Sequence, residues 1–263
     1  MHLGIHNKRA LITGAEHGLA RAIAIELARE GALVALASSS RRKVHHVLHA
    51  IGGTAKGHLA VEVDLTTPGR AKGLVKELDQ VFGHMDIAVN CLDSYQYAED
   101  GALSLERWRK VFRYNLEIAI EVNNLLIPRM KQKNWGRIVN LSSGASMEHA
   151  ATVSYCASKA ALTAYTRCMG RILAIEADNV VMSAVLPGAT LMEGGYWQKA
   201  MRRRPQEARA FLSQNSPSGR FGKPEEISPM VAMLCSTQAT YCQGAIIAID
   251  GGQARHYSQL ERP

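Results

Sequence analysis

Short apolar runs alternate along this chain with longer stretches of helical periodicity, and the alternation limits the folds that it can adopt. Strands that are joined by helices build a parallel sheet covered on both faces, with right-handed crossovers. Strands are expected near residues 9–13, 32–37, 57–63, 86–89, 136–141, 180–185 and 245–249. Helices are expected near residues 18–29, 41–51, 68–82, 104–132, 153–177 and 224–236. The pattern predicts an α/β fold with one doubly wound parallel sheet flanked by helices on both faces.

Length and composition favour one large domain. The 263 residues are 47% apolar, which suits one sizeable α/β core, and we find no internal repeat, low-complexity tract or linker. We therefore expect a single domain over residues 1–263. No apolar run approaches the roughly 18 residues of a membrane-spanning helix, and Met1–Lys8 lacks an apolar segment of signal-peptide type. These features predict a cytoplasmic protein without a membrane partner.

A net charge of +8 raises the question of an anionic partner. The densest basic runs are Arg41–Lys43 and Arg202–Arg204, and no nucleic-acid-binding motif accompanies them. Solvated helix faces or the phosphate groups of a small ligand explain these runs more simply, so we expect no nucleic-acid partner. The five cysteines are odd in number and lack CxxC pairing, which indicates neither a disulfide framework nor a metal site.

A glycine-rich turn joins the first expected strand to the first expected helix. It reads Thr13-Gly14-Ala15-Glu16-His17-Gly18-Leu19-Ala20. Gly14 permits a tight turn, and Gly18 lets the backbone approach a pyrophosphate, which the free amides of a helix N-terminus favour. A glycine-rich turn alone is more often structural, but strand, turn and helix together are the context of a Rossmann-type dinucleotide site. The candidate cofactor contacts in this turn are Gly14, Glu16, His17, Gly18 and Leu19.

Tyr155 and Lys159 are four residues apart in an expected helix, so their side chains lie on one face. A nearby ammonium favours the ionised form of a phenol, which otherwise transfers protons poorly near neutral pH. Upstream, Ser143 follows an apolar strand and presents a hydroxyl. An isolated YxxxK pair is more often a surface tyrosine on an ordinary helix. Together with the glycine turn, however, the three side chains predict a site that acts on a carbonyl or an alcohol.

These motifs resemble those of the short-chain dehydrogenase/reductase family, over Asn7 to about Gly252. The matching segments are Thr13-Gly14-xxx-Gly18, Val63-Asp64-Leu65, Asp86-xxx-Asn90, Asn115, Ser143, Tyr155-xxx-Lys159, Pro187-Gly188 and Asp250-Gly251-Gly252. The resemblance implies hydride exchange between a nicotinamide cofactor and a carbonyl or alcohol, with Tyr155 passing the proton. The implied catalytic residues are Asn115, Ser143, Tyr155 and Lys159.

The resemblance also implies which residues hold the cofactor. Asp64 matches a contact to the adenine ring, Asn90 begins the loop beneath the cofactor, and the Pro187-Gly188 turn passes the nicotinamide carboxamide. The implied contacts outside the glycine turn are Asp64, Leu65, Asn90, Tyr155, Lys159, Pro187, Gly188 and Thr190.

The end of the second strand favours NADP(H) over NAD(H). An acidic residue there binds the ribose hydroxyls of NAD and repels a 2′-phosphate, whereas arginine does the reverse. This chain has Ser38, Ser39 and Ser40 followed by Arg41 and Arg42, and no acid. Either arginine can pair with phosphate by charge-assisted hydrogen bonds. The alternative is that both arginines only begin a surface helix.

Two positions depart from the family pattern. Ala20 replaces the third glycine of the cofactor loop. The loop after the fourth strand reads Asn90-Cys91-Leu92-Asp93 where the family usually has Asn-Asn-Ala-Gly. Leu92 and Asp93 are bulkier, and one is charged, near the expected place of the nicotinamide ribose.

The resulting hypothesis is an NADP(H)-preferring ketone reductase or secondary-alcohol dehydrogenase, similar to 3-oxoacyl-carrier-protein reductases. One alternative is an NAD-linked dehydrogenase of a cyclic alcohol or dihydrodiol, and another is a low-activity cofactor-sensing or scaffold protein. A substrate lid with large apolar groups is expected near residues 189–215, between Pro187-Gly188 and Ser216-Pro217. The resemblance further implies a homotetramer or homodimer paired through the helices near 104–132 and 153–177.

Overall fold

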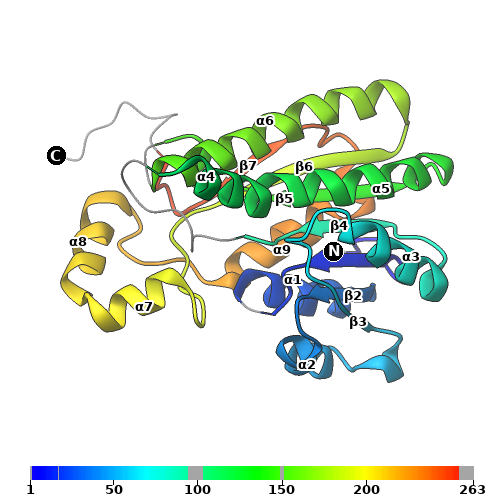
Figure 1. The fold of residues 1–263 in the computed structure, drawn as a ribbon, viewed down its shortest axis with the longest axis horizontal. Coiled ribbons are helices and arrows are strands. Elements are labelled where there is room, and N and C mark those ends of the chain that lie inside the picture. Colours follow the sequence, from blue (N-terminus) through cyan, green and yellow to red (C-terminus); the bar gives the residue numbers. More distant parts are fainter. Residues whose placement is uncertain (1, 17, 94–102, 149–150, 255–263) are drawn as a thin grey trace.

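The computed structural model describes residues 2–16, 18–93, 103–148 and 151–254. Seven strands form one parallel sheet in the order β3-β2-β1-β4-β5-β6-β7 (Figure 1). The strands are β1 (Arg9–Thr13), β2 (Leu33–Ser38), β3 (Leu59–Glu62), β4 (Ile87–Asn90), β5 (Gly136–Leu141), β6 (Val180–Pro187) and β7 (Ile246–Ile249). The strand order reverses direction at β1 and β4, which confirms the doubly wound α/β fold.

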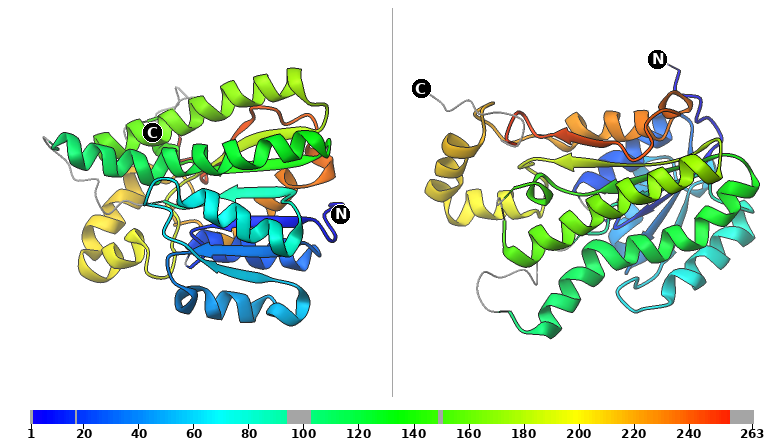
Figure 2. Two further views of the ribbon diagram at one scale, coloured as in Figure 1. Left: turned by 45° about the vertical axis from the view of Figure 1, so that its right-hand side comes forward. Right: turned by 90° about the horizontal axis from the view of Figure 1, so that it is seen from above.

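Helices cover both faces of this sheet (Figure 2). One layer consists of α1 (Gly18–Arg29), α2 (Arg41–Ala50) and α9 (Pro224–Leu234), and the other of α3 (Arg70–Phe82), α5 (Ile118–Gln132) and α6 (Val153–Glu176). Three more helices are α4 (Leu105–Phe112), α7 (Tyr196–Arg203) and α8 (Pro205–Asn215). Figure 1 shows α7 and α8 beyond the end of the sheet at which α1 begins. Within the described ranges, no helix is both long and apolar enough to cross a membrane.

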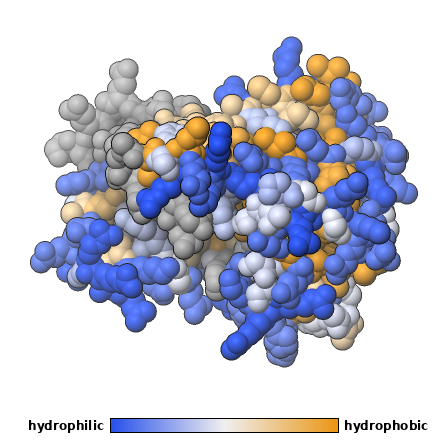
Figure 3. Space-filling view, viewed as in Figure 1, coloured by the Kyte–Doolittle hydropathy of each residue, from blue (hydrophilic) through white to orange (hydrophobic). Residues whose placement is uncertain are grey.

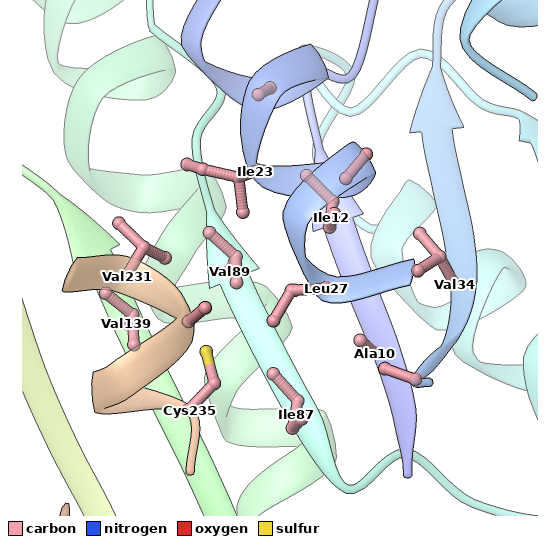
Figure 4. Packing of buried hydrophobic residues seen from close by; sticks show 14 of the residues in the cluster. Ala10, Ile12, Ile23, Leu27, Val34, Ile87, Val89, Val139, Val231 and Cys235 are labelled. Carbon is pink, nitrogen blue, oxygen red and sulfur yellow. The ribbon is translucent and has the colours of Figure 1, made fainter. Parts of the chain in front are cut away.

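The central strands are apolar on both faces because each face meets a helical layer. Successive strand side chains point in opposite directions, so Ile12 of β1 and Val89 of β4 join the cluster under α1 and α9 (Figure 4). Their neighbours Leu11 and Ala88 join the cluster under α3 and α5. Ile23 of α1 is fully buried over the first cluster. This double burial fixes the carboxyl ends of the strands relative to one another.

The helix expected over 104–132 is interrupted, which corrects that prediction. A π-helical turn, Arg113–Glu117, separates α4 from α5. Within it the side-chain amide of Asn115 donates a hydrogen bond to the carbonyl of Val111 at 2.9 Å. Insertions of this type occur in single turns and concentrate at functional sites. The helical periodicity alone did not indicate it, because the residues on either side keep a helical pattern.

Candidate active site

The carboxyl ends of β1, β4, β5 and β6 meet at the edge of the sheet where ligands bind in open α/β folds. Ser143 follows β5 and caps a short 3₁₀ turn, Gly144–Ser146, by accepting a hydrogen bond from the Ala145 amide at 3.2 Å. Tyr155 and Lys159 project from the first turns of α6, and both are buried. Asn115 lies in the π-helical turn.

A small apolar cluster connects Asn115, Ser143 and Tyr155, and Lys159 lies 5.6 Å from the Tyr155 ring centre. Tyr155 packs with Val111 and Ala145. Val111 receives the hydrogen bond from Asn115, and Ala145 donates one to Ser143. The tertiary structure therefore brings together the four residues that the sequence predicted to be catalytic, which come from three separate segments.

Lys159 is 1% exposed, and its side chain is anchored to the sheet. Its Nζ donates a hydrogen bond to the carbonyl oxygen of Leu141, the last residue of β5, at 2.9 Å. The same nitrogen lies 5.6 Å from the centre of the Tyr155 ring. A buried ammonium needs such partners because desolvating an unpaired charge is costly. The ammonium is thereby fixed close to the phenol.

Asp93 joins this pair, and its contacts with Tyr155 and Lys159 were not predicted from the sequence. Its Oδ2 accepts a hydrogen bond from the Tyr155 hydroxyl at 3.0 Å, and its Oδ1 lies 3.5 Å from the Nζ of Lys159. The signal was present in the sequence, because a carboxylate replaces a glycine of the family pattern directly after β4. A loop at that point lies at the carboxyl edge of the sheet, next to the ends of β1 and β5.

Asn90 belongs to a buried amide network whose other members the sequence analysis also missed. Its Nδ2 donates to Asn123 and Asn140, at 2.8 Å each, and the amide of Asn140 donates to Thr166 at 2.9 Å. The side chain that was expected beneath a cofactor thus ties β4 to β5, α5 and α6. The Oδ1 of Asn90 is buried and has no hydrogen-bond partner within the described part of the chain, so the network leaves one acceptor unused.

The glycine turn has the backbone that a dinucleotide site needs. Gly14 and Gly18 adopt left-handed φ angles of +68° and +55°. A Cβ at Gly18 would lie 2.8 Å from the sulfur of Met192, and a Cβ at Gly14 would lie 2.9 Å from the Cα of Leu92. These glycines therefore allow a close approach of other groups, as a pyrophosphate requires.

Two further residues of the turn, Glu16 and Leu19, have different surroundings. Leu19 is buried in the core, whereas the Oε2 of Glu16 is buried and has no hydrogen-bond partner within the described part of the chain. Glu16 also borders a cavity of about 220 Å³ between α1 and Met192. An unsatisfied buried oxygen at this place fits a turn that receives a polar ligand. The candidate His17 lies outside the described residues.

The serine and arginine segment follows β2 as expected. Ser38 is buried, with its hydroxyl accepting a hydrogen bond from the Ser40 amide at 3.2 Å, while Ser39 and Arg41 are exposed at the start of α2. The amide of Arg41 donates to Glu62 at 3.4 Å, and its guanidinium lies 3.8 Å from Glu77. Arg41 thus has acidic neighbours that the sequence pattern did not reveal.

The other predicted cofactor contacts already have partners within the chain. Asp64 accepts hydrogen bonds from the hydroxyl and the amide of Thr66. Both lower the pKa of its carboxyl, and the bond from the hydroxyl has the larger effect. Leu65 is buried, with its carbonyl accepting a hydrogen bond from Arg113 at 2.7 Å. Thr190 is buried and donates to the Gly188 carbonyl at 2.9 Å.

The Pro187-Gly188 turn ends β6 against the segment that follows β7. The Gly188 amide donates to the Ile249 carbonyl at 3.1 Å, and a Cβ at Gly188 would lie 2.7 Å from the Cα of Asp250. Pro187 is half-buried. This turn therefore leads the chain directly from the sheet edge into the expected lid.

The expected lid consists of two helices, α7 and α8, that pack through aromatic side chains. The Trp197 ring centre lies 4.1 Å from that of Phe211 and 5.0 Å from those of Tyr196 and Phe221. Its base is a parallel bridge in which the Leu191 amide donates to the Gly222 carbonyl at 2.9 Å. This bridge to Gly222 lies several residues beyond Ser216-Pro217, and the lid over 189–215 stays a prediction.

The chain is similar to known proteins over most of its length. The family described as enoyl-(acyl carrier protein) reductase matches residues 14–254. The chain is 30% identical over 249 residues to 3-oxoacyl-[acyl-carrier-protein] reductase FabG of Thermotoga maritima, covering 94% of this chain and 98% of that protein.

Two solved structures are also similar. L-sorbose reductase of Gluconobacter frateurii, complexed with NADPH and L-sorbose, superposes with a TM-score of 0.85 and 25% identity, covering 97% of this chain and 99% of that one. A 7α-hydroxysteroid dehydrogenase, complexed with NADH and 7-oxo glycochenodeoxycholic acid, superposes with a TM-score of 0.86 and 26% identity, covering 98% of each chain.

Proposed function

The chain belongs to the short-chain dehydrogenase/reductase family, an oxidoreductase family that interconverts carbonyls and alcohols, and from this premise we propose that it is an NADP(H)-preferring carbonyl reductase. The proposed substrate class is a 3-oxoacyl or related ketone, reduced to a secondary alcohol. The observation that carries the proposal is the arrangement of Tyr155 over the buried Lys159, whose Nζ is fixed to the Leu141 carbonyl.

Each residue has a role in this proposal. Tyr155 holds the transferable proton on its hydroxyl, and Lys159 stabilises the negative charge that the phenol gains when the proton leaves. Ser143 donates a hydrogen bond to the substrate oxygen, where charge develops during the reaction. Asn115 keeps the π-helical turn in place behind Tyr155. When bound, the nicotinamide dinucleotide supplies the hydride; the glycine turn, Ser38–Arg42 and Lys159 would hold it.

The preference for NADP(H) is supported by the absence of an acid at the end of β2. Ser38 lies there, and Arg41 and Arg42 follow on the exposed surface, where a 2′-phosphate would find two guanidinium groups. Glu62 of β3 and Glu77 of α3 lie beside Arg41 and compensate part of its positive charge. They favour the second candidate, an NAD-linked dehydrogenase of a cyclic alcohol, which the similar steroid dehydrogenase with NADH also supports.

A third candidate is a cofactor-sensing or scaffold protein with little turnover. It is supported by the Asp93 carboxylate, which takes the hydrogen bond of Tyr155 and lies next to Lys159. This candidate predicts that the purified chain binds a dinucleotide but turns over no ketone.

Absorbance at the nicotinamide band separates the three candidates. The purified protein is mixed with NADPH or NADH and a panel that contains a 3-oxoacyl thioester, aliphatic ketones and cyclic ketones, and Tyr155→Phe is run beside it. We expect faster oxidation of NADPH with open-chain ketones, and a rate about 10²–10⁴-fold lower in Tyr155→Phe with nearly unchanged cofactor affinity. Lys159→Ala should lower both the rate of ketone reduction and the affinity for the cofactor. A Tyr155→Phe rate close to that of the parent would refute the mechanism.

A further inference from the structure

We propose that Asp93 is an internal competitor for the catalytic donors, which holds Tyr155 and Lys159 in the cofactor-free protein and sets its affinity for the cofactor. The inference rests on the proposed function, because it takes these two residues as the catalytic pair. The geometry that carries it is the pair of contacts from one carboxylate, Oδ2 to the Tyr155 hydroxyl at 3.0 Å and Oδ1 to the Lys159 Nζ at 3.5 Å.

The competition follows from the number of available protons. A phenol has one O–H, and Tyr155 donates it to Asp93. The same O–H must point at the substrate oxygen for proton transfer. Lys159 has three N–H donors, one of which goes to Leu141 and one of which faces Asp93. For Tyr155, at least, binding to Asp93 and donation to a substrate exclude each other.

Charge strengthens the exclusion. When the phenol of Tyr155 gives up its proton, the resulting negative charge lies beside a carboxylate, and like charges at this separation repel. Asp93 also neutralises part of the Lys159 charge that would stabilise the phenolate. The competent arrangement is therefore one in which the Asp93 side chain has turned away from both groups.

The Asp93 side chain can rotate in this way while the backbone before it stays in place. The amides of Cys91 and Leu92 both donate to the Thr13 hydroxyl, at 3.1 and 3.2 Å, so these two residues are fixed to the end of β1. Gly14 lies close against Leu92. The side chain of Asp93 is 43% exposed, so only its own rotation is needed to place the carboxylate in solvent.

The test compares Asp93→Asn and Asp93→Gly with the parent, and Asp178→Asn is the control. Asparagine keeps the shape and an acceptor oxygen but loses the charge, while glycine removes both. Asp178 is an exposed carboxylate between α6 and β6, at the opposite end of the sheet from Asp93. The Kd for NADPH and for NADH is measured by fluorescence titration without substrate, and the thermal midpoint is measured with and without cofactor.

The affinity for the cofactor should rise in the order parent, Asp93→Asn, Asp93→Gly, by about tenfold or more for glycine. The reason is that a charge-assisted hydrogen bond and an ion pair hold the unbound state and so lower the apparent affinity. The thermal midpoint without cofactor should fall slightly in both variants, while the increase caused by cofactor grows. Asp178→Asn should change neither the Kd for the cofactor nor the thermal midpoint. A merely structural role would lower the midpoint without tightening Kd.

Equal or weaker cofactor binding in both Asp93 variants, with the parent binding normally, overturns this inference and leaves the proposed function standing. Binding that appears in Asp93→Gly but is absent in the parent supports the inference strongly. If neither the parent nor any variant binds either dinucleotide, the proposed function fails and the competition fails with it.

Discussion

The side-chain amide of Asn115 donates a hydrogen bond to the backbone carbonyl of Val111, four residues earlier, at 2.9 Å. Val111 in turn packs against Tyr155. The carbonyl at this point lies in the turn where α4 passes into the π-helical segment. One amide thus stabilises an irregular backbone and, through it, the apolar wall behind the proposed proton donor.

Asn115→Ala is therefore expected to lower kcat for ketone reduction more than it changes KM, because Tyr155 loses a fixed neighbour rather than a substrate contact. Stability should fall by roughly 1–2 kcal/mol, since a buried hydrogen bond is lost. Asn124→Ala, on the exposed face of α5, is the matched control. Urea denaturation and steady-state kinetics measure the two effects, and equal kinetics in both variants would contradict the assignment.

Removing both arginines after β2 should narrow the preference for NADPH. Arg41→Ala with Arg42→Ala is expected to weaken NADPH binding about 10-fold or more and to leave NADH binding nearly unchanged, because each charge-assisted hydrogen bond to phosphate contributes roughly 1.5–3 kcal/mol. Lys43→Ala, on the same exposed helix, controls for lost positive charge. Titration of both cofactors by fluorescence is the measurement. Equal affinities for the two cofactors in the parent would reject the phosphate role.

The helices α7 and α8 should report closure over the site. Trp197 packs on Phe211 and Phe221, so a movement of this pair of helices changes its surroundings. We expect NADP(H) with a product analogue to shift Trp197 emission and to protect residues 190–215 from limited proteolysis, as closing segments exclude solvent. Trp108→Phe removes one competing emitter. Equal cleavage of this stretch with and without ligands would argue against a lid.

The exposed face of α6 predicts association into dimers or tetramers. Ala160, Ala164, Cys168 and Ile172 are exposed along one helix, and Figure 3 shows apolar surface along the edge where α5 and α6 lie. Small apolar groups at helical spacing allow a close approach of a partner helix.

Ala164→Arg should therefore reduce the mass seen by light scattering at micromolar concentration, because a buried unpaired charge opposes packing. Ala50→Arg, at the end of α2, should not. A monomer mass for the parent protein would reject the assembly.

Stability should depend on pH through His58. Its Nδ1 accepts a hydrogen bond from the Val34 amide at 3.1 Å, and burial lowers its pKa below 6.5 despite a hydrogen bond with the Ile51 backbone. Because the folded-state pKa is the lower one, the unfolded chain takes up the proton first. The contribution of neutral His58 to the free energy of unfolding is therefore complete above pH 6.5, and it declines as the pH falls below that value.

His58→Gln should cost about 1 kcal/mol at pH 8, the size of one hydrogen bond, and less at pH 5. Urea denaturation at both pH values measures the change in this difference. His45→Gln, exposed on α2, should show no such change. A constant difference between parent and His58→Gln at both pH values would exclude the linkage.

Local sequence patterns predicted the features that depend on short-range interactions. Alternating apolar runs and helical periods predicted the parallel sheet, because a strand buried on both faces must be apolar throughout. The glycines at 14 and 18 predicted the turn, since few other residues adopt its positive φ angles. The spacing of Tyr155 and Lys159 placed both on one face of α6, because four residues make about one helical turn.

Contacts between groups that are far apart in the sequence followed from the arrangement of the strands in the sheet. Asp93 and Tyr155 are 62 positions apart, and their contact exists only because the loop after β4 lies beside the end of β5 and the start of α6. The network from Asn90 to Asn140 spans 50 positions for the same reason. Composition and periodicity indicate which side chains of a segment are buried and which are exposed. The pairing of two distant polar side chains depends instead on the order of strands in the sheet, which no local pattern encodes.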